Sequence, residues 1–239
     1  MSHVPRLYRA GSLGPGSLVL EGDTATRLTT VMRMRLGEPF VLFCGDGREW
    51  HATVSSAGRG TLTVTVSDVA RQATPPAVVL ETWIGTATAG RLDTAVEKCV
   101  EAGADIIKFF GSEFSSRSDA ASPNRLERWQ RIVVEAAEQC GRLYLPLVEY
   151  TGPLARALDV YRGPLVVAER QGRSAAELQP LLPGSGHLAF VVGPAGGLSP
   201  AELGVLDRRG ALRLTLGPHI LRSETAAIVG TAVLRSLTV

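Results

Sequence analysis

The sequence predicts a parallel α/β domain preceded by a small β domain. From residue 77 onward, short apolar segments alternate with amphipathic ones, as strands and helices do in parallel sheets covered on both faces. Before residue 73 the chain carries short alternating segments between polar turns, a pattern typical of a small barrel. We therefore expect a β-barrel over residues 1–73 and an α/β domain over residues 77–239.

Strand signals in the first part run from Leu18 to about Val69. Glycine turns follow two of the predicted strands, and a Gly58–Gly60 turn predicts a hairpin. The chain then reaches Ala73–Pro76, where Pro-Pro cannot continue a sheet ladder, so this stretch is predicted to be a linker. The predicted strands include Phe40–Phe43, Trp50–Val54 and Leu62–Val66.

The second part contains predicted strands separated by helices. A helix is expected over Asp93–Ala102, ended by Gly103, and a longer one over Pro123–Cys140, ended by Gly141. The last helix, Thr225–Leu237, is apolar nearly all round, so it must be buried in the fold or against another subunit. Strands are expected at Val78–Ile84, Asp105–Phe110, Pro164–Ala168, Leu188–Val192 and Ala211–Leu216.

The composition is that of an ordinary globular protein, with 45% hydrophobic and 20% charged residues and a net charge of +2. No apolar run approaches a membrane span, and the N-terminal Met1–Arg6 has no signal core. The three scattered cysteines and four scattered histidines suit neither a disulfide framework nor a metal site, so we expect a cytoplasmic protein without metal. Arginine supplies nearly all the positive charge, which suits phosphate binding but also follows from GC-rich codon usage.

A glycine-rich loop, Gly193–Leu198, joins a predicted buried strand to a helix start. Ser199, Pro200 and Glu202 form a capping-box pattern directly after it. In open α/β sheets, ligands bind at such junctions, and glycine permits close backbone approach. The loop therefore predicts a ligand site, with a tight turn that binds nothing as the alternative.

A second junction of the same kind follows the strand Ala211–Leu216. Gly217 and Pro218 lead to Ser223, a predicted N-cap, and to Glu224 in the first turn of the last helix. A carboxylate there interacts favourably with the helix dipole, so Glu224 is either a capping-turn acid or a catalytic group.

Four sequence blocks together indicate a family. They are Val31–Gly37 with Phe43–Gly47, the helix Arg128–Arg142 followed by Pro146, the loop Gly193–Gly197, and Leu216–Pro218 with Ile220–Ala226. In these blocks and in their order, the sequence resembles the RsmE-type family of the SPOUT (trefoil-knot) methyltransferases, and the resemblance spans almost the whole chain.

The resemblance implies a PUA-like barrel that helps hold RNA and a knotted SPOUT domain that binds S-adenosyl-L-methionine without a metal. It further implies a homodimer that methylates N3 of a uridine in 16S ribosomal RNA of the small subunit and releases S-adenosylhomocysteine. Positions matching the family's cofactor loops are Gly193, Pro194, Gly196, Gly197, Leu216, Gly217, Ile220, Leu221, Arg222 and Thr225.

Methylation at uridine N3 requires loss of a proton that is held at neutral pH, so a base or a cation must help. Glu224 is our candidate base, with Glu138 a weaker one, and Arg222 or Arg142 is the candidate stabiliser. Arg142 has an equally good alternative role at the end of its helix, and Arg222 has one as a contact to the cofactor carboxylate or an RNA phosphate.

Arginines of the barrel are candidates for the RNA backbone, or else part of a solvated surface. They are Arg6, Arg9, Arg33, Arg35 and Arg48.

The chain departs from the family pattern at Ala195, where glutamate is usual, and at Ala89-Gly90, where a lysine is usual. These departures motivate two alternatives: a non-catalytic RNA-binding or ribosome-assembly factor on the same scaffold, and a SPOUT methyltransferase that acts on another RNA.

Overall fold

The computed structural model describes residues 4–58, 60–86, 89–115 and 122–238. Arg59 of the predicted hairpin turn lies outside the described residues, as do Met1–His3. Contacts divide the chain into two compact units. The first contains Met1–Pro75 together with Ala137–Leu145, and the second contains Pro76–Ala136 and Pro146–Val239. The predicted linear division at residues 73–77 did not include the return of 137–145 to the first unit.

The first unit is a five-stranded sheet in the order β1-β3-β4-β5-β2, mostly antiparallel, with β1 parallel to β3. Its apolar core draws on all five strands and on the short helix α1. Irregularities in the β4–β5 register bend this long pair of strands. The elements are β1 (Arg6–Tyr8), β2 (Gly16–Glu21), α1 (Gly22–Thr26), a π-helical turn (Arg27–Val31), β3 (Pro39–Phe43), β4 (Arg48–Ala57) and β5 (Thr61–Gln72).

Arginines of the first unit satisfy carbonyl groups at the end of helix α3 (Pro123–Cys140). Gly141, at φ +80°, ends this helix as predicted. Arg6 donates to the carbonyl oxygens of Ala137 (2.6 Å) and Arg142 (2.5 Å), and Arg71 donates to that of Gly141 (2.6 Å). The last carbonyls of a helix have no partner within the helix, so these side chains stabilise its end.

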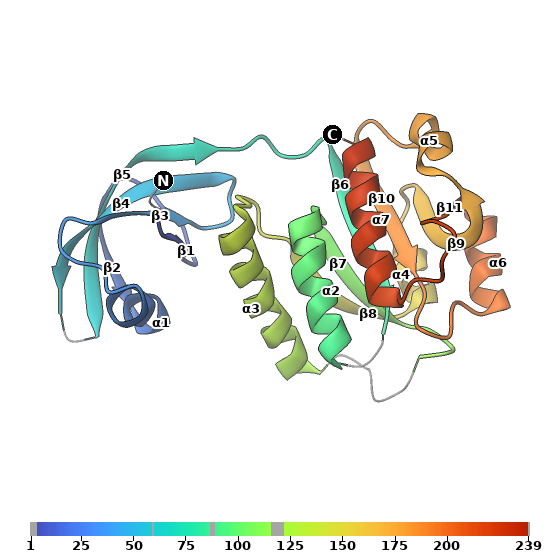
Figure 1. Cartoon of the computed structure of the whole chain (residues 1–239), viewed down its shortest axis with the longest axis horizontal. Helices are drawn as coiled ribbons and strands as arrows, with labels where there is room; N and C mark the ends of the chain where they lie inside the picture. The colour runs from blue at the N-terminus through green and yellow to red at the C-terminus, as the bar shows by residue number, and fades with distance from the viewer. Residues whose placement is uncertain (1–3, 59, 87–88, 116–121, 239) are drawn as a thin grey trace. The chain divides into compact units, whose positions relative to one another are not determined.

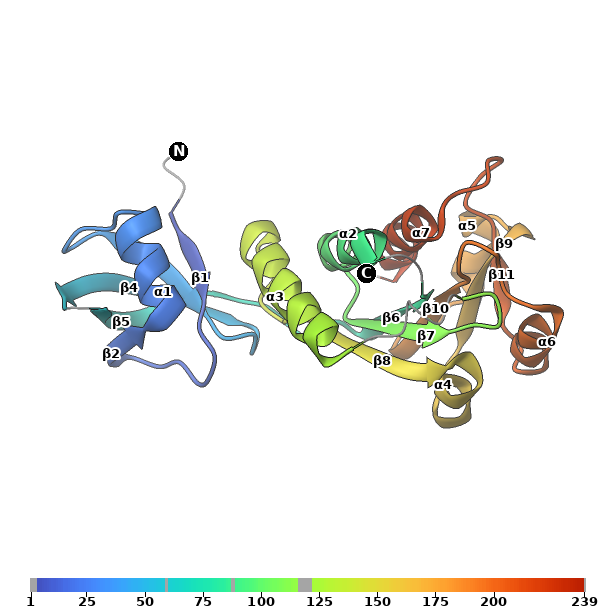
Figure 2. The same cartoon turned by 90° about the horizontal axis from the view of Figure 1, so that it is seen from below.

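The second unit contains a six-stranded parallel sheet in the order β11-β9-β10-β6-β7-β8. Helices α2 and α7 lie side by side on one face, and α4 lies on the other (Figures 1 and 2). The elements are β6 (Val78–Gly85), α2 (Ala89–Ala102), β7 (Ile106–Gly111), β8 (Leu147–Pro153), α4 (Leu154–Val160), β9 (Leu165–Arg173), α5 (Ala175–Leu178) with a 3-10 turn (Gln179–Leu181), β10 (Gly186–Val192), α6 (Pro200–Arg208), β11 (Leu212–Leu214) and α7 (Ser223–Leu237).

Helix α2 begins earlier than predicted. The sequence predicts a start at Asp93, whereas the helix begins at Ala89. Asp93 instead accepts hydrogen bonds from Arg128 Nε (2.8 Å) and Trp129 Nε1 (3.0 Å) of α3. Its carboxylate therefore ties two helices of the sheet together.

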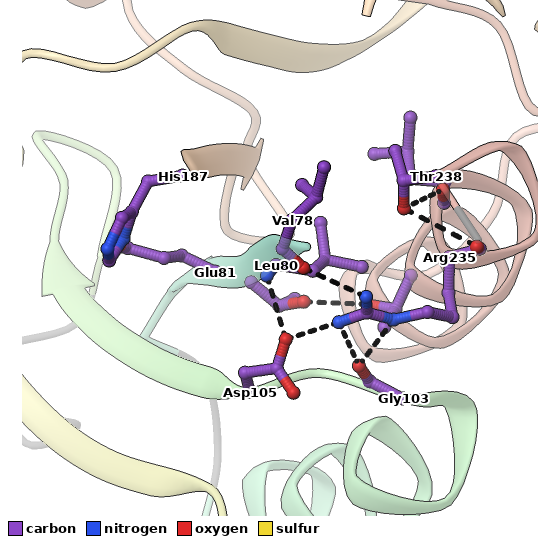
Figure 3. Close-up of polar contacts among 11 residues, drawn as sticks. Val78, Leu80, Glu81, Gly103, Asp105, His187, Arg235 and Thr238 are labelled. Atoms are coloured by element: carbon purple, nitrogen blue, oxygen red, sulfur yellow. Dashed lines mark hydrogen bonds and ion pairs between the residues drawn. The ribbon is translucent and has the colours of Figure 1, made fainter. Parts of the chain in front are cut away.

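Helix α7 is fixed at its C-terminal end by Arg235, as Figure 3 shows. The guanidinium donates to the carbonyl oxygens of Gly103 (2.8 and 3.0 Å) and Val78 (3.0 Å) and forms an ion pair with Asp105. Asp105 also accepts the backbone N–H of Leu80 (2.9 Å). One side chain thus joins α7 to the starts of β6 and β7, which positions the helix whose other end reaches the site below.

A buried carboxylate, Glu81, lies on the sheet face opposite α7. It is 3% exposed and accepts hydrogen bonds from Lys108 Nζ (2.8 Å) and Trp83 Nε1 (2.9 Å), while His187 Nδ1 lies 2.8 Å from its other oxygen. Burial acts to raise the pKa of Glu81, but these hydrogen bonds outweigh it and hold the pKa below its ordinary value. The network keeps a charge inside the sheet.

Candidate functional site

The glycine-rich loop follows β10 and leads into α6. The capping box is confirmed: Ser199 Oγ accepts the Glu202 N–H (3.3 Å), and Glu202 accepts the Ser199 N–H (2.8 Å). Gly197 lies at φ +78° and donates to the Pro194 carbonyl (2.8 Å), which closes the turn. A Cβ on Gly193 would lie 3.0 Å from backbone atoms of Gly197 and Leu198, so this tight loop requires glycine.

The second loop runs from the end of β11 to α7. Gly217 lies at φ +114°, where a side chain is rarely tolerated. The predicted N-cap at Ser223 is wrong. The N-cap is Arg222, whose backbone carbonyl accepts the Ala226 N–H (2.8 Å), and Ser223 is the first helical residue. Because the first helical hydrogen bond begins one residue earlier than expected, Glu224 still lies in the first turn.

A cavity of about 490 Å³ lies between these two loops, within the volume range of small-molecule sites. Since all six strands are parallel, the carboxyl ends of β9, β10 and β11 meet at this edge of the sheet. Of the predicted cofactor residues, those that line the cavity are Gly193, Pro194, Gly197, Leu216, Gly217, Ile220, Leu221 and Arg222.

Gly196 and Thr225 are not among the lining residues. Gly196 turns its Cα toward Phe114, and a Cβ there would lie 3.0 Å from the Phe114 Cβ. Thr225 is half-buried on α7.

Four titratable residues that sequence reasoning missed also line the cavity: Arg91, Glu169, Arg170 and His219. Together with Arg222 they give the site three arginines against one carboxylate. The rule that ligands bind at the carboxyl ends of strands could have indicated Arg91, because it lies in the first turn of the helix after β6.

Glu224 is the candidate base and does not itself line the cavity. Its side chain is 13% exposed; one carboxylate oxygen lies 3.8 Å from Arg91 Nε, and the other lies 3.4 Å from Ser223 Oγ. Both contacts are long, so the carboxylate keeps the capacity to accept further hydrogen bonds. Arg91 therefore connects Glu224 to the cavity wall.

The two other candidates, Glu138 near the end of α3 and Arg142 just after it, belong to the first unit. Glu138 accepts the Tyr8 N–H (2.8 Å) and pairs with Arg27 (2.8 Å), so it stabilises that unit, and we no longer retain it as a candidate base. Arg142 contributes its backbone carbonyl to Arg6. The carbonyls at the end of α3 are bound by Arg6 and Arg71, as described above.

The barrel arginines differ in their contacts. Arg6 is half-buried against Phe43, 3.6 Å from the ring centroid, and pairs with Glu49 (2.7 Å), so its charge is used within the protein and it does not suit an RNA contact. Arg9 donates to the Ser12 carbonyl (3.1 Å). Arg33 and Arg35 are exposed, and Arg33 holds a left-handed φ of +53°. Arg48 pairs with Asp46 (2.6 Å).

Within the described part of the chain, no group of three or more His, Cys, Asp or Glu side chains is arranged to hold a metal ion. Nor does any helix there have the length and apolarity to cross a membrane.

The fold and the cavity define an α/β protein with a ligand site at the ends of parallel strands and a separate β unit. Residues 74–235 match the family model "RNA methyltransferase domain", and residues 20–67 match "RNA methyltransferase PUA domain". The chain therefore belongs to the RNA methyltransferase family that contains ribosomal RNA small subunit methyltransferase E.

Relatives of that name cover most of this chain. The protein of Mycobacterium tuberculosis is 33% identical over 92% of this chain and 86% of its own length, and that of Bacillus subtilis is 27% identical over 87% and 86%.

Two solved structures each cover 98% of both chains. One is ribosomal RNA small subunit methyltransferase E of Neisseria gonorrhoeae bound to S-adenosyl methionine (29% identity, TM-score 0.84). The other is a Legionella pneumophila protein described as a methyltransferase, in complex with the cofactor SAM (25% identity, TM-score 0.83). The predicted family and fold class are confirmed.

Proposed function

We propose that this protein transfers the methyl group of S-adenosyl-L-methionine to ribosomal RNA of the small subunit. The observation that carries the proposal is the cavity between the loops after β10 and β11. Two solved relatives that match 98% of this chain bind the same cofactor, and curated relatives carry the name of a small-subunit RNA methyltransferase.

The residues present fit this cofactor. Its methyl group is bound to a sulfonium centre, from which it is transferred to a nucleophile. Glycines 193 and 197 leave backbone close to the cavity, which suits the polar edges of adenine, while Leu216 and Leu221 supply apolar contact to its faces. Arg91 and Arg222 are cationic partners for the carboxylate of the methionine part.

The finer assignment is methylation at N3 of a uridine in 16S ribosomal RNA. That nitrogen holds its proton at neutral pH, so Glu224 is proposed to accept the proton and Arg222 to stabilise the resulting anion. The contact between Glu224 and Arg91 supports a carboxylate held ready beside the cavity rather than one used only for the helix dipole.

The first 73 residues are proposed to hold RNA and residues 77–239 to bind the cofactor and form a dimer. Arg33 and Arg35 remain proposed phosphate contacts because both are exposed, and Arg9 is retained with them. One face of α7 is buried, but Val229 on the other face is 37% exposed, which supports a homodimer through this helix. The reaction is proposed to take place in the cytoplasm.

Two measurements test the function. Calorimetry with S-adenosyl-L-methionine is expected to give saturable binding to one site per chain, and the absence of binding would favour the non-catalytic assembly factor suggested by Ala195. Mapping of modified nucleotides in RNA from a strain that lacks the gene is expected to show one unmethylated uridine in 16S RNA. A missing methyl group in transfer RNA instead would favour the alternative substrate.

A further inference from the structure

The segment after β7 carries an aromatic side chain that is exposed to solvent. Phe114 is 52% exposed, whereas every other aromatic residue of the chain is buried or half-buried. An exposed phenyl ring is an unfavourable contact with water, and isolated proteins more often place such rings in the core. The question is what this ring binds.

Hydrogen bonds on both sides hold the Phe114 backbone in place. Ser112 Oγ donates to Glu202 Oε2 (2.8 Å), and the Glu113 N–H donates to Glu202 Oε1 (3.3 Å). Ser115 Oγ donates to the Thr86 carbonyl just after β6 (3.3 Å). The segment is therefore tied to the start of α6 and to the end of β6, so the ring is presented from a fixed position.

The ring lies beside the glycine-rich loop. A Cβ on Gly196 would lie only 3.0 Å from the Phe114 Cβ, so this glycine allows the two segments to approach. The neighbouring residues Gly193, Pro194, Ala195 and Gly197 line the cavity. Phe114 therefore lies at the back of the loop that forms one cavity wall.

We propose that Phe114 is a stacking platform for an unpaired base of the RNA substrate beside the cofactor cavity. The inference rests on the proposed function, because it takes RNA as the substrate. A flat, uncharged ring on a fixed backbone segment complements the face of a base. Enzymes that modify bases take the base out of its stack and bind it between aromatic or apolar side chains. Arg170, the arginine at the cavity that the proposed cofactor site does not use, complements a phosphate that accompanies such a base.

The test compares four variants at one position. Phe114→Tyr and Phe114→Trp keep an aromatic face, Phe114→Leu keeps apolar bulk without one, and Phe114→Ala removes both. Two quantities are measured on small ribosomal subunits from the deletion strain: methyl transfer from labelled S-adenosyl-L-methionine, and equilibrium binding in the presence of S-adenosylhomocysteine. The affinity for S-adenosyl-L-methionine and the molar mass in solution are measured alongside.

Loss of stacking is expected to weaken subunit binding and to lower kcat/KM by roughly 5- to 100-fold in both Phe114→Leu and Phe114→Ala. The tyrosine and tryptophan variants are expected to stay within about threefold of the wild type, and cofactor affinity and molar mass are expected to stay unchanged. Wild-type behaviour of Phe114→Leu would overturn the proposal. A changed molar mass would overturn it too, because the ring would then pack against a second copy of the chain.

The binding measurement separates this proposal from the proposed function. If Phe114→Leu and Phe114→Ala bind subunits more weakly than the wild type but the wild type transfers no methyl group, the stacking role stands and the methyltransferase function fails. If the wild type methylates its RNA and binding is independent of residue 114, the function stands and the stacking role fails.

Discussion

Removing the guanidinium of Arg235 is expected to destabilise the second unit strongly. The Arg235→Met variant keeps the apolar stem but removes the guanidinium from the carboxylate of Asp105 and from the carbonyls of Gly103 and Val78. The Arg235 and Asp105 side chains are only 18% and 15% exposed, so water cannot fully replace these contacts. Breaking one partner of a buried pair costs about 3–5 kcal/mol.

The lower end of that range is expected here, about 3 kcal/mol, because Asp105 keeps the backbone N–H of Leu80 and some solvent contact. Urea unfolding followed by circular dichroism measures the loss, and for a chain of this size Tm is expected to fall by roughly 6–12 °C. Arg235→Lys keeps the charge but not the planar fork, so an intermediate loss is expected.

The matched control is Arg208→Ala, which removes an exposed arginine from the last turn of α6. Its free energy of unfolding is expected to stay within about 0.5 kcal/mol of the wild type. A Tm of Arg235→Met within about 2 °C of that control would refute the reasoning, since it would mean that the Arg235 contacts contribute no more than a surface charge.

Three further predictions concern the sheet and the site. Gly85→Ala is expected to weaken S-adenosyl-L-methionine binding by roughly tenfold, because the new Cβ would lie 2.5 Å from Pro194 in the cavity loop. Calorimetry should show no such loss for the control Gly184→Ala, whose new Cβ would have no atom within 4 Å. Glu81→Gln is expected to lower the free energy of unfolding at neutral pH and to make that free energy depend less on pH in the acid range. Because the pKa of Glu81 is lowered in the folded protein, the stabilisation that its carboxylate gives the wild type is complete above the ordinary glutamate pKa, about 4.3, and is lost as the pH falls through the folded-state pKa. Curves of stability against pH that run parallel for the wild type and Glu81→Gln from pH 6 to pH 3 would contradict this. Glu224→Gln is expected to slow single-turnover methyl transfer by about 10²- to 10⁴-fold with cofactor affinity nearly unchanged, and an unchanged rate would exclude Glu224 as the base.

Sequence periodicity predicted the central strands better than the edge strand β8. Val78–Ile84 and Leu188–Val192 were predicted as strands, and β6 and β10 contain both ranges and pair at the centre of the sheet. Strand β8, Leu147–Pro153, was not predicted. It lies at the sheet edge and is buried only in part, so its sequence lacks the continuous apolar run that marks a central strand.

The site was predicted only where one short segment contains its own signal. The loops after β10 and β11 carry glycines and helix starts that are visible in the sequence, and both contribute to the cavity. Arg91 and Arg170 come from segments whose sequences carry no ligand motif, and they reach the cavity because β6 and β9 flank β10. The order of the strands in the sheet brings such residues together, and a local sequence pattern does not reveal that order.

The sequence by itself determined the α/β class and the two loops, because glycine requirements, capping residues and apolar periodicity are local properties of the chain. It indicated the family through four motif blocks that resemble those of known members. The tertiary structure decided which charges remain available. It placed Arg6 and Glu138 in internal contacts and left Arg91 at the cavity beside Glu224. Whether an arginine is free to bind a ligand depends on the carboxylates and carbonyls that folding brings within reach, and those partners lie more than 100 residues away in the cases of Arg6, Arg27 and Arg91.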